Sequence, residues 1–536
     1  METVNQLSTF FSPSNHNEYK IEISIFLISI VLAYVFMHRW NQRNVKGPKS
    51  WPIIGVLIEL LMNFNRMHDW ATDYFVESKT FKVPLPFISV TFIADPANVE
   101  HVLKTNFNNY PRGEAFQANM EELLGDGIFN SDGEIWRQHR KTTGLEFASK
   151  NLRNFGTIVF KDYALILSDI LHQASIHNKE IDIQDLFLRM TLDSTCKVGF
   201  GAEIGSLAND LPSRFAKAFD QATSTVSSRF ENPLWKLQRF LNVGGEALFV
   251  QSIQVIDEFT YSLIHKRKAE LQGAKSPDNN GNKEKHDMLS RFIELSEIPG
   301  SNLTDKILRD AVINFLLAGR DSTASTLSWF IYMIMMNPNV AEKIYMELIA
   351  FEENQAKEMI AYDPRDPKCF TEKLTQFASL LNYDSLGKLP YLHATITETL
   401  RLYPAVPQNS KGVLEDDNLP DGTKVRAGGV VNYVPYAMGR MVYNWGPDAI
   451  VFNPDRWFNK EGSFESASPF KFTAFNAGPR TCLGKDSSYL QMKITLAILC
   501  RFFDFHLIPN HPVKYKMTIA LSMERGLKLS TTTKKS

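Results

Sequence analysis

A single cysteine near the carboxyl end constrains the fold of this chain more than any other residue. Cys482 lies in the segment 475–484 between Gly478 and Gly484, and a helical pattern starts near Lys485. The glycines allow the backbone to fold tightly around the sulfur, and a helix start adds partial positive charge. Both features favour the thiolate, the form of cysteine that binds metal. The segment predicts a metal-binding thiolate; the plain alternative is a glycine-flanked cysteine of the core.

The neighbouring sequence narrows the kind of metal site. No second cysteine or histidine stands beside Cys482, which does not suit tetrahedral zinc or an iron–sulfur cluster. An axial ligand to haem needs only one such residue, because the porphyrin supplies the ligands of the ring plane. The remaining cysteines, Cys196, Cys369 and Cys500, are too few in 536 residues for a secreted disulfide framework, and they indicate a reducing compartment.

The amino terminus predicts a membrane anchor. Residues 23–37 carry no charge, Glu22 and Arg39 bound this apolar run, and three further basic residues follow by position 49 without an acid among them. Positive charge stays on the cytosolic side of a membrane, so we expect the bulk of the chain to face the cytosol. A cleaved signal peptide would need small residues after the run, where this chain has a histidine and an arginine. A buried core helix is the plain alternative.

The chain divides into one anchor and one large folded part. A length of 536 residues fits either two modest domains or one large mixed domain. We expect four segments: a lumenal tail (1–22), a transmembrane anchor (23–40), a basic, proline-containing hinge (41–55) and a folded domain (56–536). The formal net charge of −1 gives no argument for a nucleic-acid partner.

The folded domain is expected to be mostly α with small β-sheets. Helical patterns dominate from 97 to about 336. Short strands are predicted near 85–94, 421–434 and 513–529. Two segments are polar, a loop at 273–285 and an irregular surface insertion at 352–384.

One predicted helix has an unusual centre. Thr304 can cap it, and it could run to Met336, about 50 Å at helical rise. Its flanks are apolar, but residues 314–323 contain a glycine, a carboxylate and two hydroxyls, which are costly in a buried helix. The plain alternative is a polar face that packs on another helix.

Five short elements together resemble the cytochrome P450 family. They are Trp136 with Arg140, the run 318–323, Glu398 with Arg401, the run 454–457 and the run 475–484. They occur in the family's order and span most of the chain beyond the anchor. Each element alone is weak, since a glutamate three residues before an arginine occurs in many helices. The resemblance implies the cytochrome P450 fold, with a long central helix over haem b.

The resemblance also implies roles for individual residues. Residues 56–536 would form the haem-thiolate monooxygenase domain, with Cys482 as the iron ligand. Glu398 and Arg401 would form a buried triad with Arg456. Haem-binding residues would be Trp136, Arg140, Ala318, Gly319, Phe475, Gly478, Arg480 and Gly484, with Trp136, Arg140 and Arg480 at the propionates. The family often has an arginine a few residues after Pro407, where this chain offers Lys411.

The polar centre of the long helix matches the family's proton-delivery residues. Asp321 and Ser322 take the places of an acid and an alcohol, although the family usually has threonine directly after the acid. Serine keeps the hydroxyl but loses the methyl group that restricts its rotamer, and Thr323 follows it. Small Ala318 and Gly319 would leave room for dioxygen.

Within the family, the chain is most similar to plant-type fatty-acid ω-hydroxylases. The similarity lies in 124–130, 318–321, 432–440 and 478–480. It implies these apolar substrate contacts: Phe129, Phe315, Leu317, Ala405, Val406, Ala520 and Leu521. Arg112 is a candidate for the substrate carboxylate, with a solvated loop residue as the alternative.

The expected function is insertion of one oxygen atom of dioxygen into a C–H bond of a lipophilic substrate, and ω-hydroxylation of long-chain fatty acids is preferred. The alternatives are rearrangement of lipid hydroperoxides, oxidation of a terpenoid or steroid, and a non-enzymatic haem sensor. The chain has no glycine-rich dinucleotide fingerprint, so electrons would come from NADPH–cytochrome P450 reductase, received near Lys485 and Arg137. The expected location is the endoplasmic reticulum membrane, crossed once, with the catalytic domain in the cytosol.

Overall fold

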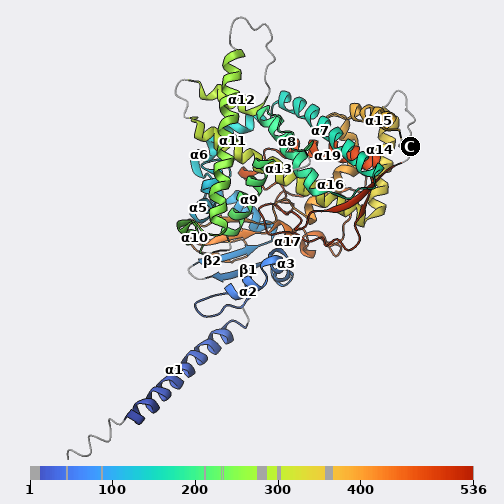
Figure 1. Ribbon diagram of the computed structural model, residues 1–536. Coiled ribbons are helices and arrows are strands. Elements are labelled where there is room, and N and C mark those ends of the chain that lie inside the picture. Colours follow the sequence, from blue (N-terminus) through green and yellow to red (C-terminus); the bar gives the residue numbers. More distant parts are fainter. Residues whose placement is uncertain are drawn as a thin grey trace, which may run out of the picture.

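The longest helix of the folded body, α13 (Asp305–Met336), runs through its middle (Figure 1). Thr304 caps it by accepting a hydrogen bond from the backbone N–H of Ile307, and it ends at Asn337, before Pro338, as the sequence predicts. Most of its residues are buried, and α8 (Ile183–Phe200) packs closely against it. The helix thus lies largely within the protein, with α8 on one side of it.

The computed structural model describes residues 13–43, 46–85, 88–209, 213–230, 232, 234–274, 287–298, 303–355 and 366–534. The other helices of these residues are α1 (Pro13–Asn41), α2 (Leu57–Met62), α3 (Met67–Glu77), α4 (Pro96–Glu100), α5 (Glu114–Leu124), α6 (Gly133–Phe147), α7 (Lys150–Ile176), α9 (Arg214–Arg229), α10 (Trp235–Leu241), α11 (Gly245–Ala274), α12 (Met288–Ser296), α14 (Pro338–Gln355), α15 (Pro367–Leu380), α16 (Pro390–Leu402), α17 (Pro435–Met438), α18 (Val442–Trp445) and α19 (Lys485–Phe502).

The strands form small sheets at the edge of the helical body. They are β1 (Thr80–Leu85), β2 (Ile88–Ile93), β3 (Ile181–Asp182), β4 (Asn409–Gly412), β5 (Asp417–Asn418), β6 (Lys424–Val425), β7 (Val430–Tyr433), β8 (Phe503–Leu507) and β9 (Lys528–Thr533). The largest sheet has the order β1-β2-β7-β4, in which β2 and β7 are parallel and the other pairs antiparallel. This confirms a mostly α fold with small sheets.

Two expectations for the carboxyl half are wrong. The predicted irregular insertion contains α15, because Phe370, Leu374 and Phe377 share one helix face and are buried. The strands predicted over 513–529 are reduced to one isolated bridge between Tyr515 and Met523 and to the start of β9, which pairs with β8. Most of the predicted loop at 273–285 lies outside the described residues.

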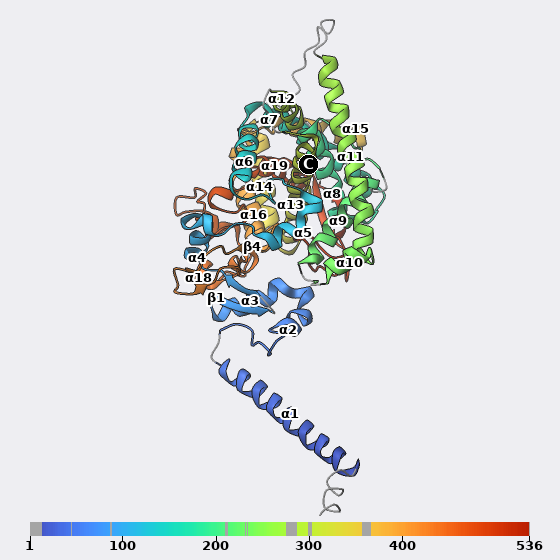
Figure 2. The same cartoon turned by 90° about the vertical axis from the view of Figure 1, so that its left-hand side faces the viewer.

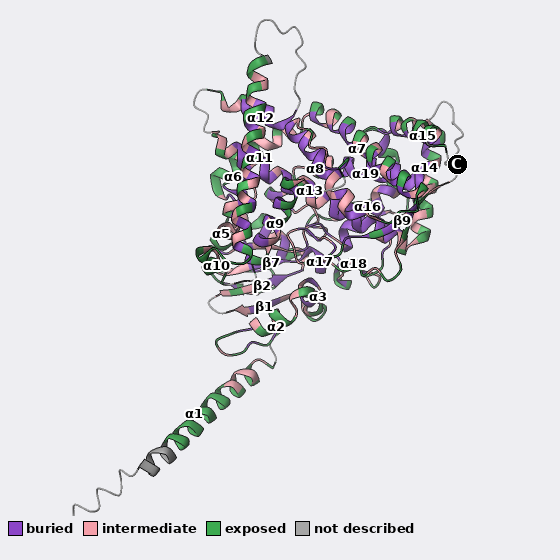
Figure 3. Cartoon of the chain, in the orientation of Figure 1, coloured by how far each residue is buried: buried purple, intermediate pink, exposed green. Residues whose placement is uncertain are grey.

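The amino-terminal helix α1 projects away from the folded body (Figure 1). Its segment Lys20–Asn41, 22 residues long, is apolar enough to cross a membrane and is not buried against the rest of the chain (Figure 3). At helical rise this segment measures about 33 Å, which matches the thickness of a bilayer core. The apolar helix is thus longer than the run of uncharged residues alone.

Candidate active site

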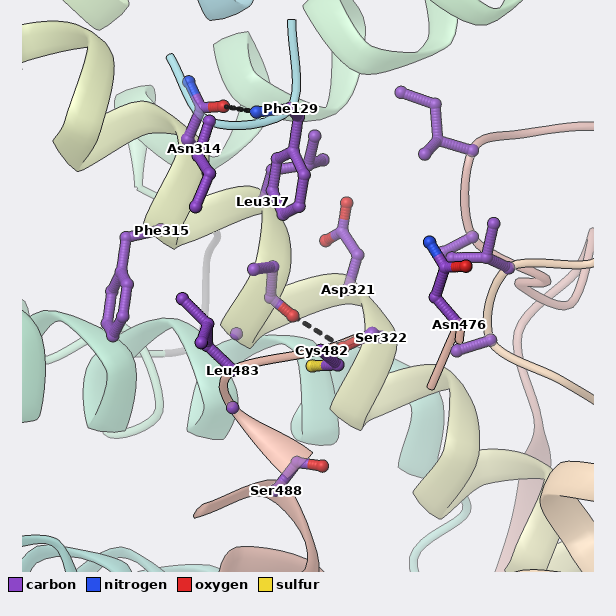
Figure 4. Close-up of a pocket in the computed structure, with 18 of the residues that line it drawn as sticks. Phe129, Asn314, Phe315, Leu317, Asp321, Ser322, Asn476, Cys482, Leu483 and Ser488 are labelled. Carbon is purple, nitrogen blue, oxygen red and sulfur yellow. Dashed lines mark hydrogen bonds between the residues drawn. The ribbon is translucent and has the colours of Figure 1, made fainter. Parts of the chain in front are cut away.

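A cavity of about 490 Å³ lies between the centre of α13 and the loop that carries Cys482 (Figure 4). Residues from distant parts of the sequence line it, from α3, α5 and α6 to the segment 517–520. Aromatic side chains form much of its wall: Phe116, Phe129, Phe160, Phe230, Phe292, Phe315 and Phe475. The cavity therefore has a polar part at the Cys482 loop, called the floor below, and an apolar part lined by these aromatic side chains, called the chamber.

Cys482 faces the cavity from a tightly folded loop. Its backbone N–H donates to the carbonyl of Phe475 at 2.8 Å, and its side chain is exposed to the cavity. Burial among the surrounding atoms raises the pKa of the thiol, whereas the backbone N–H of Gly484 and the charges of Arg140 and Lys485 lower it. The predicted stabilisation of the thiolate is present but is outweighed by burial. A bound metal ion, which deprotonates a coordinating thiol outright, would reverse this balance.

Glycine is required at positions 478 and 319 for two different structural reasons. Gly478 has φ +65, and a Cβ there would collide with the carbonyl oxygen of Leu103, so only glycine lets the loop approach that backbone. A Cβ at Gly319 would lie 2.7 Å from Oγ1 of Thr195 on α8. The missing side chain of Gly319 therefore allows α13 and α8 to pack closely, in addition to bordering the cavity as expected.

Three arginines line one end of the cavity. Arg480 donates to Asp132 at 2.5 Å and to the carbonyl of Ser131 at 3.0 Å, and Arg140 donates to the carbonyl of Thr481 at 2.6 Å. The Nε atoms of Arg480 and of the third arginine, Arg112, are buried and have no partner among the described residues. This end can accept further negative charge.

Trp136 on α6 supports the same cationic end. The guanidinium groups of Arg480 and Arg140 lie 4.4 Å and 5.9 Å from the centre of its ring. Its side chain is buried and borders the cavity. The structure thus brings together the three residues expected at the propionates.

Arg112 and Lys411 differ from what the sequence suggested. Arg112 donates to Asn409 at 2.6 Å and lies against Phe116, and its charge acts on both Arg480 and Lys411. It belongs to the cationic end, so it is neither a solvated loop residue nor a group at the far end of the chamber. Lys411 is fully buried, its Nζ has no partner in the described part of the chain, and burial holds its pKa well below the usual range.

Asp321 borders the cavity within a chain of charged groups. Arg320 on α13 donates to Asp321 at 2.8 Å and to Asp220 of α9 at 2.6 Å. Burial raises the pKa of Asp321 to about 6; Arg320 opposes this shift and Asp220 adds to it. A carboxyl group with such a pKa can both hold and release a proton near neutral pH.

The hydroxyl residues next to Asp321 also border the cavity. Ser322 donates to the carbonyl of Ala318 at 2.6 Å, within its own helix (Figure 4), and Thr323 is buried. The oxygen of Ser322 keeps lone pairs that can accept a hydrogen bond from the cavity. Ala318, Asp321, Ser322 and Thr323 thus share one stretch of the cavity wall.

A buried ion network lies outside the cavity, at the end of α16. Arg401 donates to both carboxylate oxygens of Glu398, at 2.8 Å and 2.7 Å, and Arg456 donates to Glu398 at 3.0 Å. Arg401 also donates to the backbone carbonyls of Ala449 and Val451. The structure therefore brings the expected triad together and ties α16 to the segment that follows α18.

The expected substrate contacts divide into two groups. Six of them line the cavity: Phe129, Phe315, Leu317, Ala405, Val406 and Ala520. Leu521 is not among the residues that line the cavity and is fully buried in the core. Its N–H donates to Ala405, and its carbonyl accepts from Ser325 and Trp329 of α13. These bonds fix the neighbouring segment 517–520 against the cavity.

The sequence analysis did not identify several residues of α5, α9 and α12 and their flanks that line the cavity. Phe116 and Met120 come from α5, Phe230 follows α9, and Phe292 belongs to α12. The rings of Phe116 and Phe230 lie 5.5 Å apart. No local motif marks these positions, because their only shared property is their place around the cavity.

The cavity fits haem b. The porphyrin ring needs apolar walls, which Phe475, Leu483 and Ala318 provide next to Cys482. The two propionates need cations, and the end lined by Arg480 and Arg112 carries unpartnered, buried guanidinium nitrogens. The donor set of one cysteine and several arginines is thus complementary to an iron porphyrin.

Comparison with known proteins agrees with this site. The family model "Cytochrome P450" matches residues 45–530. Cytochrome P450 704B1 of Arabidopsis thaliana is 61% identical, over 95% of this chain and 99% of that protein. Cytochrome P450 704C1 of Pinus taeda is 45% identical, over 93% and 94% of the two chains, and cytochrome P450 86B1 of A. thaliana is 37% identical, over 97% and 93%. The chain therefore belongs to the cytochrome P450 family of monooxygenases, which use haem b, dioxygen and a redox partner to oxidise lipophilic substrates.

Proposed function

We propose that this enzyme hydroxylates long-chain fatty acids at or near the methyl end. The observation that carries the proposal is the shape and lining of the cavity. From the floor at Cys482 it opens into a chamber walled by aliphatic and aromatic side chains, among them Phe129, Leu317 and Phe292. Such walls suit an alkyl chain better than a polar ring system.

Attack at the terminal carbon requires firm positioning. A primary C–H bond is stronger than the secondary bond one carbon further in, so an enzyme must hold the methyl group at the reacting centre to favour it. Ala405, Val406 and Ala520 lie on the cavity wall, and the bond from Leu521 to Ala405 at 2.9 Å holds their two segments together. We infer that this wall guides the end of the alkyl chain.

The chain's own residues would hold haem and move protons. When bound, haem supplies the redox chemistry of dioxygen activation. Cys482 would hold the iron, while Arg112, Arg140 and Arg480 would bind the propionates, with Arg112 in place of the arginine often found near Lys411. Asp321, with its pKa near 6, would pass protons to the cavity. The hydroxyl oxygen of Ser322 would accept a hydrogen bond from the group that carries the proton.

Arg320 would position Asp321. It is buried and bonds both Asp321 and the half-exposed Asp220. A guanidinium group keeps its proton at any physiological pH, so Arg320 fixes the carboxyl group without transferring a proton itself. Water would have to reach Asp321 through the cavity.

We propose that the enzyme lies on the endoplasmic reticulum membrane with its catalytic domain in the cytosol. Support comes from the apolar segment Lys20–Asn41 and from a second apolar surface. Phe240 on α10 is 84% exposed and Met62 on α2 is 81% exposed, and both helices lie on the side of the body that α1 leaves (Figure 2). The sequence 233–235 together with Phe240 also predicts an apolar surface here, although Pro233 lies outside the described residues.

NADPH–cytochrome P450 reductase is the redox partner that we propose. Lys485 follows the cysteine loop and is exposed, and Arg137 is 54% exposed on α6. Helix α6 meets the Cys482 loop through the bond from Arg140 to the carbonyl of Thr481. Lys485 and Arg137 can attract an acidic partner surface, and such attraction weakens as salt is added.

The proposal is tested by incubating the enzyme, this reductase and NADPH with lauric, palmitic and oleic acids. Terminal alcohols or diacids support it. Turnover of a terpenoid or steroid without turnover of any fatty acid contradicts the substrate class. Conversion of a lipid hydroperoxide without reductase, and of no fatty acid with it, indicates a rearranging enzyme instead.

A further inference from the structure

One part of the cavity, which we call the arm, is lined by a histidine that the mechanism does not use. His68 on α3 lines the cavity and is only 1% exposed. Neither of its ring nitrogens has a hydrogen-bond partner among the described residues. A buried donor or acceptor without a hydrogen-bond partner costs folding free energy. A polar group of a bound ligand would supply the missing partner.

The surroundings of His68 keep its ring neutral and fixed. Burial and the nearby charge of Arg440 lower the pKa of His68 to about 3. The rings of Tyr436 and Tyr515 lie 5.6 Å and 5.1 Å away. Both tyrosine hydroxyls donate to Asp69, at 2.8 Å and 2.9 Å, so neither donates its hydrogen to the ring of His68. A neutral imidazole offers one N–H donor and one nitrogen acceptor.

A second unpartnered polar atom borders the same cavity. Oε1 of Gln408 is buried and lacks a partner within the described chain. Its neighbour Pro407 accepts a hydrogen bond from the backbone N–H of Tyr436 at 3.1 Å. Since the ring of Tyr436 lies against His68, this bond brings the Gln408 segment toward the same arm. Two chain segments far apart in sequence thus contribute unsatisfied polar atoms.

The charged groups near the arm bond to other groups of the protein. Arg440 donates to the carbonyls of Leu402 and Tyr436, and its guanidinium lies 3.5 Å from the centre of the Tyr436 ring. Asp69 is occupied by the two tyrosines. The neutral ring of His68 and Oε1 of Gln408 are therefore the polar groups that a ligand meets in this arm.

We propose that this arm binds a neutral hydroxyl-bearing group of the substrate, either an alcohol or an un-ionised carboxyl group. The hydroxyl, or the O–H of the carboxyl group, would donate to the ring nitrogen of His68 that carries no hydrogen. The inference rests on the proposed function in one respect: the rest of the ligand is an alkyl chain that runs toward Cys482. The arm would add a polar contact that favours alkyl chains with a hydroxyl-bearing group over unsubstituted alkyl chains.

The test is calorimetric titration of the haem-loaded enzyme with two matched pairs of ligands. A long-chain primary alcohol is compared with its methyl ether, and the fatty acid of the same length with its methyl ester. His68→Phe keeps the aromatic packing and removes both polar atoms. We expect it to weaken binding of the alcohol, the acid or both by about threefold to tenfold, and to leave the ether and the ester unchanged.

Two further variants separate recognition from folding. His68→Gln retains a donor and an acceptor and should restore part of the lost affinity. His393→Phe is the matched control, because the half-buried His393 also lies between two rings, each 4.5 Å away, with a pKa lowered to about 3, yet it does not line the cavity. It should not alter the preference for hydroxyl-bearing ligands.

The outcomes decide between the possibilities. Loss confined to the acid assigns the arm to a carboxyl group, and loss confined to the alcohol assigns it to a hydroxyl. Equal weakening of all four ligands, or no change in His68→Phe, overturns the proposal. If the fatty acids are not oxidised terminally but the His68-dependent preference persists, the proposed function fails while this subsite stands.

Discussion

Asp321 is the titratable residue most directly tied to function, because it combines a cavity position with a perturbed pKa. Its carboxyl group touches Arg320 on one side and the cavity on the other. We expect Asp321→Asn to retain haem and to lose product formation by about 10²–10⁴-fold, the range typical of acid–base relays. Measurement of haem content and turnover in the same preparation checks this. Asp220→Asn, at the exposed end of the same ion network, should lose far less.

The pKa of Asp321 also predicts how its contribution to stability changes with pH. Its folded pKa, about 6, is raised above the ordinary value of 3.8. The folded state therefore holds the proton more tightly, and the ionisation of Asp321 costs stability as pH rises from about 4 to 6. Asp321→Asn should gain about 1–3 kcal/mol over the parent above pH 6. Urea unfolding at pH 4 and pH 7.5 tests this, and an equal gain at both values would contradict it.

At this scale, sequence predicted the residues whose chemistry is unusual for their local context. Cys482 and Asp321 stand out beside glycines or within an apolar helix, and both border the cavity. The places of His68, Arg112 and Leu521 were not predicted, since they depend on which distant segment each residue meets. His68 meets the cavity through Tyr436 and Tyr515, which follow it by several hundred positions.

At the scale of elements, the ion network of α16 holds two segments together. Arg401 is fully buried and pairs with Glu398 three residues earlier. Arg401→Lys cannot reproduce the paired bonds to Glu398 together with those to Ala449 and Val451. We expect a loss of about 3–5 kcal/mol of folding stability, the range for a broken buried ion pair, together with poorer haem retention. Chemical unfolding and the haem-to-protein ratio measure both.

An exposed pair of the same spacing provides the control. Arg291 and Glu294 are also three residues apart, but their side chains are 53% and 47% exposed. Exposed pairs contribute little, so Arg291→Lys should leave the unfolding midpoint unchanged. Equal losses in both variants would mean that burial of the α16 pair is not what matters.

Elements with a regular sequence pattern and clear end signals were predicted better than elements without them. The cap at Thr304 and the proline after Asn337 gave both ends of α13. The helix α15 was missed because its polar residues outweighed its apolar stripe, and the strands expected over 513–529 failed because only Lys528–Thr533 finds a partner strand. Pairing between distant strands is a tertiary property that local composition does not contain.

At the scale of the whole molecule, the anchor and the folded body should be separable. Removal of residues 1–43 should free much of the protein from membranes and leave haem binding intact, because the body begins beyond α1 (Figure 1). Some attachment should persist through the apolar surface around Phe240 and Met62. Membrane flotation of the truncated protein checks this, with Phe240→Ser as a second change that should lower the residual attachment. A truncated protein unable to bind haem would contradict the division.

The central claim is that Cys482 holds the iron of a haem-thiolate monooxygenase. The most direct measurement is the spectrum of the ferrous carbonyl complex in Cys482→Ser, with Cys196→Ser as the control. Cys196 is buried on α8, and burial raises the pKa of its thiol, so its replacement should leave the spectrum unchanged. The account predicts that Cys482→Ser loses the thiolate-type Soret band while Cys196→Ser keeps it. A thiolate-type band that persists in Cys482→Ser would contradict the account.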